Sequence, residues 1–319
     1  MLKLMKKNLK LAILGLGQMG QNHLRNLNML KGVEICWLYD LDERVLKKLS
    51  SNYGIPYTID VLQAIEDVDA VIIATPTAKH FSFFKLCVGK VRNVFIEKPL
   101  ADSYNVALEM QKLAKKYDTF VQCGFIERYN PVIKELKNII QKESVIHFDF
   151  FRTNKHSSRI KDVDVILDLM IHDIDLALYL NGPIIDLSSH GNKQGNLLAF
   201  AMTTLTHKNG SFSRILASRV TEKKIRKIQA TTTKSFIEAE LLSQRLSLHS
   251  QSKAQIIVNS DYKISAVESI IEVVRREPLL VELKSFIDNC SGNRSLEFPG
   301  LKDSVEALRI CEIIKNSVC

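Results

Sequence analysis

The feature that most constrains the fold of this chain is a glycine-rich turn that directly follows a short apolar run near the N-terminus. Residues 9–15, LKLAILG, predict a buried parallel strand. Gly15, Gly17 and Gly20 follow in G-x-G-x-x-G spacing, and a helical pattern and a second apolar run ending in Asp40 come next. This order of strand, glycine turn, helix, strand and acid is typical of a dinucleotide-binding fold.

Each glycine of this turn has a separate physical role in such a fold. Gly15 permits the tight turn, Gly17 lets the backbone approach a pyrophosphate, and Gly20 lets helix and strand pack closely. The pyrophosphate rests on the N-terminus of the following helix, so we also expect Gln18 and Met19 at the cofactor. The simpler alternative is that these glycines only make a turn.

Asp40 indicates which dinucleotide binds. A carboxylate at the end of the second strand accepts both ribose hydroxyls and repels a 2′-phosphate, which favours NAD over NADP. Arg44 follows it closely and leaves NADP open. The alternative role for Asp40 is an N-cap of a helix over residues 42–50.

Further β/α units place polar residues at the carboxyl ends of their strands. Strands are predicted within 69–80, 93–99 and 119–125, and helices over about 80–90 and 103–117. Ligands of an open parallel sheet bind at these strand ends. The residues that fall there, and that we therefore expect at the site, are Thr75, Pro76, His80, Glu97 and Lys98.

The pattern changes after about residue 125. A helix is expected over 131–141, a strand over 144–152 and an amphipathic helix near 165–180. Asn209-Gly210 is a strong hairpin signal, so the consecutive strands that follow predict an antiparallel sheet. The strand-like segments cover 197–207, 211–220, 225–233, 235–241 and 245–250, and helical stretches cover about 264–290 and 301–318.

The predicted fold class is therefore α/β, with two domains. Residues 1–123 form a Rossmann dinucleotide-binding domain, and residues 124–319 form an α+β domain with a large, mostly antiparallel open sheet. We expect the second domain to bind the substrate and to support oligomerisation. The C-terminal helix 301–318 is expected to pack back toward the first domain.

The open sheet also predicts assembly. Helices 131–141 and 165–180 can cover one face of it, and an apolar second face left to water exceeds what monomers usually tolerate. A homodimer or homotetramer formed by sheet-on-sheet packing follows, unless the outer face is polar or the C-terminal helices cover it. The apolar residues behind this expectation are Leu198, Phe200, Met202, Phe212, Ile215, Leu216, Ile228, Phe236 and Ile237.

Composition excludes several classes of protein. The net charge is +9, but the basic residues are spread out and no nucleic-acid-binding motif is present, so an anionic small molecule or a generally lysine-rich composition explains the charge. No apolar stretch is long enough to span a membrane, so no membrane partner is expected. The six cysteines are scattered without a C-x-x-C pair, which favours a reduced, cytoplasmic location.

The segment DLMIHDID, within the helix predicted over 165–180, carries the clearest acid–base candidates. Asp168, His172 and Asp175 are spaced i, i+4, i+7 and share one face of an α-helix. A carboxylate one turn from a histidine orients the ring and stabilises its charged form. A metal site would need more ligands, so no metal is expected, and a solvated helical face is the other alternative.

The chain as a whole resembles the Gfo/Idh/MocA oxidoreductases. The resemblance is carried by GLGQMGQNH at 15–23, ATPTAKH at 74–80, FIEKPLA at 95–101 and DLMIH at 168–172. It implies an NAD(P)-dependent enzyme that acts on a sugar, an inositol or a nucleotide sugar. Lys98 matches the active-site lysine of the family, and Asp168 and His172 match its acid and histidine.

Within the family, VQCGFIERYNP at 121–131 and VDVILDLMIHDIDLAL at 163–178 are most similar to the short UDP-N-acetylglucosamine 3-dehydrogenases. This similarity implies oxidation at C3 of UDP-N-acetylglucosamine or a related UDP-amino sugar, with an aminotransferase as a possible downstream partner. A dehydrogenase of a free sugar or inositol, and a non-catalytic NAD(P)-binding sensor, are the alternatives. The stretch 153–158, TNKHSS, matches no motif that indicates its role.

Hydride transfer from a secondary alcohol suggests a role for each residue. His172, with an ordinary pKa of about 6.5, is the natural general base. Lys98 donates a hydrogen bond to the developing alkoxide, and Asp168 holds the other two in place. A buried lysine with a lowered pKa is the alternative base. The expected substrate contacts are Lys98, His172, Arg128, Tyr129, Asn130, Arg152 and Arg159. For each arginine the alternative is an ordinary surface position without a substrate contact.

Overall fold

The computed structural model describes residues 8–154, 163–257, 261–292 and 297–318. The chain divides into two compact units. The first contains Met1–Ile126 and Glu277–Arg309, and the second contains Glu127–Arg276 and Ile310–Cys319. The sequence places one boundary after residue 123, whereas in the structure the chain also returns to the first unit at Glu277.

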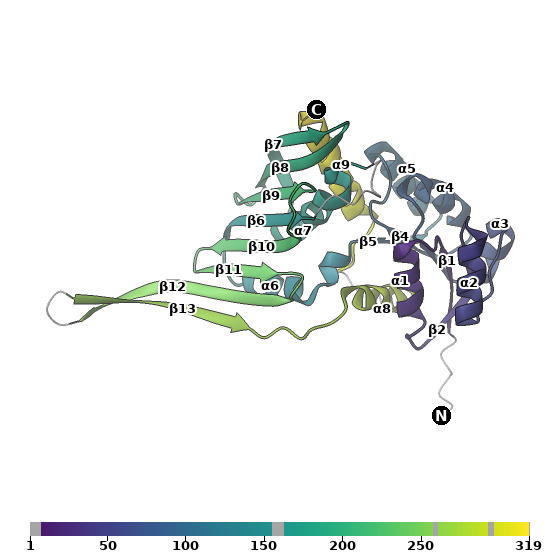
Figure 1. The fold of residues 1–319 in the computed structure, drawn as a ribbon, viewed down its shortest axis with the longest axis horizontal. Helices are drawn as coiled ribbons and strands as arrows, with labels where there is room; N and C mark the ends of the chain where they lie inside the picture. Colours follow the sequence, from purple (N-terminus) through teal and green to yellow (C-terminus); the bar gives the residue numbers. More distant parts are fainter. Residues whose placement is uncertain (1–7, 155–162, 258–260, 293–296, 319) are drawn as a thin grey trace, which may run out of the picture. The chain divides into compact units, whose positions relative to one another are not determined.

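A parallel sheet of five strands forms the centre of the first unit, in the order β2-β1-β3-β4-β5 (Figure 1). Its strands are nearly continuous apolar runs, as expected where helices cover both faces of a parallel sheet. The order reverses at β1, and this switch point is where such folds bind dinucleotides. The strands are β1 Leu9–Leu14, β2 Val33–Tyr39, β3 Ala70–Ile73, β4 Asn93–Glu97 and β5 Phe120–Gly124.

The helices of the first unit alternate with these strands, which confirms the predicted Rossmann domain. Asp42 caps α2 and Asp60 caps α3, since each carboxylate accepts a backbone N–H of the first turn. The helices are α1 Gln18–Leu27, α2 Glu43–Tyr53, α3 Val61–Ala64, α4 Thr77–Cys87 and α5 Tyr104–Lys116, with short 3₁₀ turns at Ile65–Asp67 and Ile126–Tyr129.

One further helix of the first unit comes from near the C-terminus. Helix α8, Pro278–Cys290, packs beside α1 (Figure 1). Its Phe286 is fully buried, with its ring centroid 5.5 Å from that of Phe95 and 6.3 Å from that of Phe120. The helix predicted over 264–290 is therefore wrong in its first part: Asp261–Ile271 is strand β13, and α8 begins at Pro278.

An eight-stranded sheet forms the second unit, in the order β13-β12-β11-β10-β6-β9-β8-β7 (Figure 1). Every described pairing is antiparallel except that of β6 with β9, so the predicted open, mostly antiparallel sheet is confirmed. The strands are β6 Val145–Thr153, β7 Ile184–Gln194, β8 Leu197–His207, β9 Phe212–Ser218, β10 Ile225–Thr232, β11 Ser235–Glu240, β12 Arg245–Ile257 and β13 Asp261–Ile271.

Helices cover one face of this sheet. Helix α6, Pro131–Ile140, packs on β11 and β12, and the π-helical turn Ile166–Met170 with α7, Ile171–Asn181, packs on β6 and β9. The last helix of the chain, α9, Leu301–Val318, belongs to the first unit up to Arg309 and to the second unit from Ile310.

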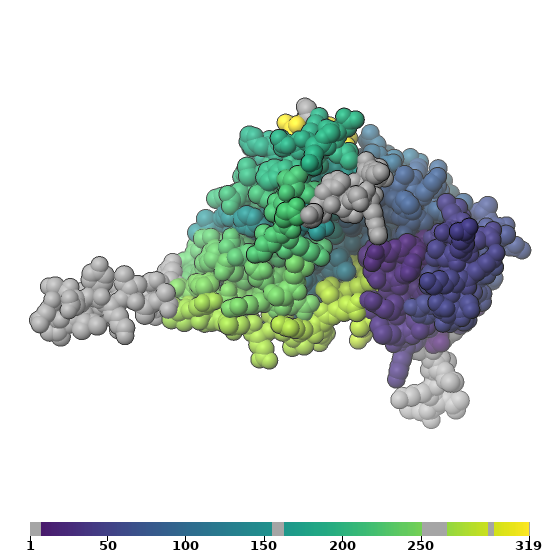
Figure 2. All heavy atoms as spheres, viewed as in Figure 1, coloured from purple at the N-terminus to yellow at the C-terminus, as the bar shows by residue number. Residues whose placement is uncertain are grey.

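The other face of the sheet is more polar than its sequence suggests. Ion pairs cross it between Arg214 and Asp149, at 2.5 Å, and between Lys227 and Glu238, at 2.5 Å. Strands coloured teal to light green make much of the visible surface of this unit in Figure 2. Of the nine apolar residues behind the expected assembly, Leu198, Ile215, Ile228 and Ile237 are buried within this unit, and Phe212 is exposed.

Within the described ranges, no helix is both long enough and apolar enough to cross a lipid bilayer.

Candidate functional site

The glycine-rich turn lies between β1 and α1, and its three glycines differ in their surroundings. Gly15 has a φ of +92°, and a Cβ there would lie 2.7 Å from backbone atoms of Ala74. A Cβ on Gly20 would lie 1.9 Å from the carbonyl oxygen of Gly15. A Cβ on Gly17 would meet nothing within 4 Å. Gly15 and Gly20 are therefore required by packing, whereas Gly17 leaves open space beside the helix.

That open space lies at the N-terminus of α1. Gly17 is the N-cap, so no side chain of this residue caps the helix, and Gln18 and Met19 are the first helical residues. The first N–H groups of a helix have no intrahelical acceptor and attract anions. This placement fits the pyrophosphate position expected from the sequence.

Asp40 lies directly after β2, beside the glycine-rich turn. Its Oδ2 accepts the N–H of Leu16 at 2.5 Å, and its Oδ1 accepts the N–H of Asp42 at 2.9 Å. Asp42 is the residue that caps α2, through a hydrogen bond from the N–H of Arg44 at 2.9 Å. The alternative that Asp40 is the helix cap is therefore wrong, and its carboxylate lies where a ribose contact is expected.

The loops after β3 and β4 are joined by a buried histidine. Nε2 of His80 lies 2.9 Å from the carbonyl oxygen of Thr75, and its Nδ1 lies 2.9 Å from that of Pro99. Burial lowers the pKa of His80, and a neutral ring donates to only one of these oxygens at a time. Pro76 is the N-cap of α4, so Thr75, Pro76 and His80 form one connected loop segment.

Thr75 also provides a test of whether a cofactor fits this edge. Its Oγ1 is buried and has no hydrogen-bond partner among the residues that the structure describes. A buried hydroxyl without a partner is rare in proteins unless a ligand or water satisfies it. Together with the open space at Gly17 and the carboxylate of Asp40, this hydroxyl fits a dinucleotide lying along the carboxyl ends of the strands.

Glu97 and Lys98 end strand β4. Glu97 is buried, and its Oε1 lies 2.7 Å from Nε2 of His23 on α1. Its Oε2 accepts the backbone N–H of Lys98 at 3.2 Å. The contact with His23 has no signal in the sequence, because His23 is distant in the chain and only the fold brings α1 to the end of β4.

In the second unit, Asp168 lies in the π-helical turn and His172 in the first turn of α7. Asp168 is paired with Arg219, which follows β9: the Nη2–Oδ2 distance is 2.9 Å. Arg219 also donates to the backbone oxygens of Val163 and Asp164, so it attaches this turn to the sheet. Nothing in the sequence pattern indicates Arg219, since the contact joins residues far apart in the chain.

Two of the three residues expected on one helical face, Asp168 and Asp175, pair with different arginines. Asp175 is buried and accepts two hydrogen bonds from Arg128, at 2.8 and 2.6 Å, whereas Asp168 pairs with Arg219. Because Ile166–Met170 is π-helical, the α-helical spacing from Asp168 to Asp175 does not apply.

Two of the arginines expected to bind phosphate are instead paired with buried carboxylates. Arg152 is 1% exposed and donates to Asp173 and Glu127 at 2.8 Å, so its guanidinium is occupied by buried carboxylates rather than open to a substrate. Burial by itself lowers the pKa of Arg152, but the two carboxylates outweigh this effect and raise it. The side chain of Arg128 is buried against Asp175. Arg159 and most of the stretch 153–158 lie outside the described residues.

The neighbouring residues at 129 and 130 are also positioned. Asn130 is the N-cap of α6, where its Oδ1 accepts the N–H of Val132 at 3.2 Å, and its Nδ2 donates to the carbonyl of Leu241. Asn130 is 3% exposed, so it has a structural role in this unit. Tyr129 ends the 3₁₀ turn and is half-buried.

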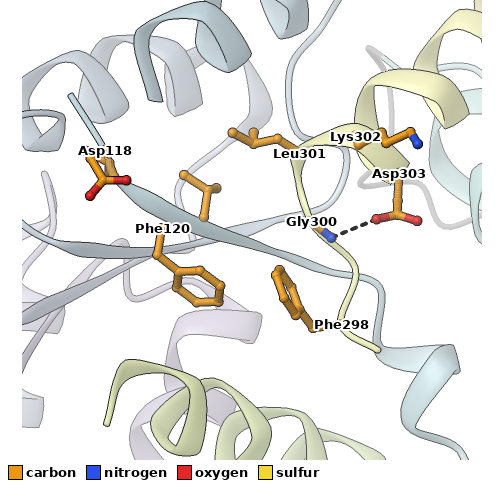
Figure 3. Close-up of a pocket in the computed structure, with 9 residues that line it drawn as sticks. Asp118, Phe120, Phe298, Gly300, Leu301, Lys302 and Asp303 are labelled. Carbon is orange, nitrogen blue, oxygen red and sulfur yellow. Dashed lines mark hydrogen bonds between the residues drawn. The ribbon is translucent and has the colours of Figure 1, made fainter. Parts of the chain in front are cut away.

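A hollow of about 400 Å³ lies elsewhere in the first unit (Figure 3). It is lined by the beginning of β5 and the N-terminus of α9, with Phe120 and Phe298 on one side and a hydrogen bond from the N–H of Gly300 to Asp303 on another. These residues lie at the amino end of β5. The hollow is therefore not at the edge of the sheet where dinucleotides bind.

The fold and this strand-end edge define a dinucleotide-binding protein of the Rossmann class. Residues 9–125 match the GFO_IDH_MocA family, described as an oxidoreductase family with an NAD-binding Rossmann fold. Residues 9–125 therefore form an NAD-binding Rossmann domain of this oxidoreductase family.

Known proteins resemble the chain over most of its length. UDP-N-acetylglucosamine 3-dehydrogenase of Acidithiobacillus ferrooxidans is 23% identical over 92% of both chains, and its solved structure matches with a TM-score of 0.88 over 98% of both chains at 21% identity. The NAD(+)-dependent scyllo-inositol 2-dehydrogenase of Bacillus subtilis is 26% identical over 67% of this chain and 68% of its own. An oxidoreductase of Agrobacterium radiobacter in complex with NAD+, L-tartaric acid and magnesium matches with a TM-score of 0.82, at 20% identity, over 98% of this chain and 96% of that one.

Proposed function

We propose that the protein oxidises a secondary alcohol of a sugar with NAD, and that the substrate is UDP-N-acetylglucosamine or a related UDP-amino sugar, oxidised at C3. The observation that carries the choice of substrate is the extent of the similarity. The UDP-N-acetylglucosamine 3-dehydrogenase of Acidithiobacillus ferrooxidans aligns over 92% of this chain, whereas the inositol dehydrogenase of Bacillus subtilis aligns over 67%. The similarity therefore includes most of the second unit, which is where we expect the substrate to bind.

The chemistry requires the alcohol proton and the hydride to leave in different directions. Bound NAD supplies the hydride acceptor. In our proposal a ring nitrogen of His172 takes the hydroxyl proton, and Nζ of Lys98 donates a hydrogen bond to the oxygen as negative charge develops on it. Asp168, held by Arg219, orients the histidine. Lys98 as the base, with His172 in the supporting role, is the alternative assignment.

The diphosphate of the proposed substrate requires cationic or hydrogen-bonding partners. Arg152 and Arg128 are engaged by buried carboxylates. Arg159 and Tyr129 are thus the remaining candidates from the sequence analysis.

The test is a substrate screen that follows NADH formation with UDP-N-acetylglucosamine, free N-acetylglucosamine and inositols. We expect turnover of the UDP-sugar only, and an aminotransferase with its amino donor is added to remove the reactive 3-keto product. Lys98→Met and His172→Asn should each lower kcat by about a hundredfold or more while NAD affinity changes little for His172→Asn. Turnover of inositols alone would make the protein an inositol dehydrogenase, and NAD binding without turnover of any of these substrates would support a sensor.

Two further expectations remain predictions. A homodimer or homotetramer is expected to give at least twice the monomer mass of 36.2 kDa in sedimentation, although the ion pairs on the outer face leave less apolar surface to drive it. A cytoplasmic location is consistent with the cysteines, because no disulfide joins those in the described part of the chain.

A further inference from the structure

A buried histidine–carboxylate pair joins the glycine-rich helix to the loop that carries Lys98. His23 is fully buried and Glu97 is 8% exposed, and the Nε2–Oε1 distance is 2.7 Å. The ring of His23 also makes an edge contact with Phe95, two residues before Glu97 on the same face of β4, at a centroid distance of 5.3 Å. Neither residue is a catalytic group in the function proposed above, so the pair needs a reason of its own.

The second ring nitrogen of His23, Nδ1, indicates where the proton between His23 and Glu97 resides. Nδ1 of His23 is buried and has no hydrogen-bond partner within the described parts of the chain. A proton on Nδ1 would be a buried donor without an acceptor, which is costly. This cost disfavours a ring protonated on both nitrogens. It also disfavours a protonated Glu97 that donates to a ring with its proton on Nδ1. The remaining arrangement is a neutral ring that donates its Nε2–H to an ionised carboxylate.

The carboxylate is therefore stabilised by hydrogen bonds from neutral groups. Its second oxygen accepts the backbone N–H of Lys98 at 3.2 Å. The neighbouring strand leaves room for it, because a Cβ on Gly124 would lie 2.8 Å from Oε2 of Glu97. A carboxylate held by N–H donors keeps its negative charge in a buried position.

The position of this charge in the sheet indicates what it acts on. A dinucleotide on this fold lies with the ribose of its adenosine half at Asp40, after β2. Its pyrophosphate lies at the turn after β1. In the order β2-β1-β3-β4-β5, the remaining half of the molecule, with the nicotinamide ring, continues toward the ends of β3 and β4. Glu97 is the last residue of β4.

We propose that His23 is a positioning residue that keeps Glu97 ionised, and that this fixed negative charge makes the site bind NAD, whose nicotinamide ring is cationic, more tightly than NADH, whose ring is neutral. The inference rests on the proposed function only through the identity of the cofactor. It concerns how the site distinguishes the two redox forms, and it predicts that the reduced cofactor leaves the site more readily than the oxidised one.

The experiment measures dissociation constants of NAD and NADH by calorimetry, without any sugar, for the parent and four variants. Glu97→Gln keeps the shape and removes the charge, so the NAD-to-NADH preference should fall about tenfold, the effect of one unit charge in a partly hydrated site. His23→Leu removes the donor, and it should shift the preference in the same direction. His23→Gln retains an amide N–H and should restore most of it.

His207→Gln is the matched control. His207 is a buried histidine of the second unit with hydrogen bonds to Gly182 and Ser213, so its loss disturbs packing without touching the cofactor edge. The NAD-to-NADH preference of His207→Gln should equal that of the parent. A preference shifted equally by His207→Gln, or unchanged in folded Glu97→Gln, would overturn the inference.

A second measurement does not depend on whether the His23 variants fold. Nitrogen-15 NMR of the parent should show the ring of His23 with its proton on Nε2 and none on Nδ1. A ring protonated on both nitrogens would overturn the inference. A parent that binds neither NAD nor NADH would contradict the proposed function itself. If the parent binds both and Glu97→Gln has the same NAD-to-NADH preference, only the role of the His23–Glu97 pair is contradicted.

Discussion

The cofactor edge of the first unit and the Asp168 turn of the second unit are assembled in opposite ways. The cofactor edge consists of local segments, each of which ends a strand and begins a helix: the turn at Gly15–Gly20, Asp40 and the Thr75 loop. The Asp168 turn is fixed by Arg219, which lies 51 residues away in the chain and donates to Asp168, Val163 and Asp164. The three segments of the first are determined by local turns, whereas the second is held by an ion pair between residues far apart in the chain.

This difference has a consequence for how mutations act. In the second unit, several polar residues are part of buried ion pairs, including Arg152, Asp173 and Glu127. Substituting them changes stability before it changes chemistry. In the first unit, positions such as Gly17 and Asp40 border open space or solvent, so substitutions there change binding more than folding.

The largest expected effect tests the buried charges. Arg152→Met leaves Asp173 and Glu127 buried without the cation that pairs with both, and it should lower the free energy of unfolding by about 3–5 kcal/mol. Burial raises the pKa of Glu127, but Arg152 and Arg226 outweigh this and lower it, so the carboxylate stays charged in the native protein. Urea unfolding measures the loss.

Arg214→Met is the matched control for this variant. Arg214 pairs with Asp149 at the surface, with its side chain 46% exposed, so its removal should cost less than about 1 kcal/mol. If the two variants lose equal stability, the second unit does not depend on buried charge in the way described.

The next effect separates packing from binding within the glycine-rich turn. Gly20→Ala places a methyl group 1.9 Å from the carbonyl oxygen of Gly15, so the backbone must move, and stability should fall by about 3 kcal/mol. Gly17→Ala meets nothing within 4 Å and should cost only about 1 kcal/mol, but it should weaken NAD binding about tenfold or more because the pyrophosphate approaches there. Thermal unfolding and NAD titration of both variants are compared. Normal NAD affinity in Gly17→Ala would place the pyrophosphate elsewhere.

A smaller effect concerns the choice of cofactor. Asp40→Asn removes the charge that accepts ribose hydroxyls and repels a 2′-phosphate, so the preference for NAD over NADP should fall about tenfold. Asp42→Asn, which alters the cap of α2, should leave this preference unchanged. Dissociation constants for both cofactors provide the measurement. Equal affinities in the parent would show that Arg44 outweighs Asp40.

The smallest effect is a pH dependence of stability. Because burial lowers the pKa of His80, the unfolded chain binds a proton that the native protein resists, in the pH range below the ordinary histidine value of about 6.5. Stability should therefore fall as the pH drops through this range, by at most about 1.4 kcal/mol per pH unit for this group, and be unaffected above it. His80→Gln should reduce the slope. An unchanged acid slope in this variant would mean that His80 is already charged in the native state.

Much of the fold could be predicted because its signals are local. The spacing of Gly15, Gly17 and Gly20, the apolar strands and the hairpin at Asn209-Gly210 each indicate structure within a few residues. The helix predicted over 264–290 is wrong in its first part because Val267, Ile270 and Val274 follow a helical spacing. Pairing with β12 makes this part of the chain a strand. Pro278, a favoured first residue of a helix, was the signal for where α8 begins.

The candidate site was predictable only in part, because only some of its signals are local in the sequence. Asp40, His80 and Glu97 end strands, and their positions follow from the sheet. Their partners do not, because contacts such as His23 with Glu97 depend on how helices fold over the sheet. The π-helical turn at Ile166–Met170 likewise has no sequence signature, and it separates Asp168 from Asp175.

The return of α8 to the first unit determines the order in which the protein can mature during synthesis. Leu283 and Phe286 complete the core around Phe95 and Phe120, yet they leave the ribosome only after the whole sheet of the second unit. A nascent chain ending at Ile126 therefore exposes an apolar surface that only a later segment can cover, a state prone to aggregation and to chaperone capture. We expect the dinucleotide-binding unit to be transplantable between proteins only as two pieces, Met1–Ile126 together with Glu277–Arg309.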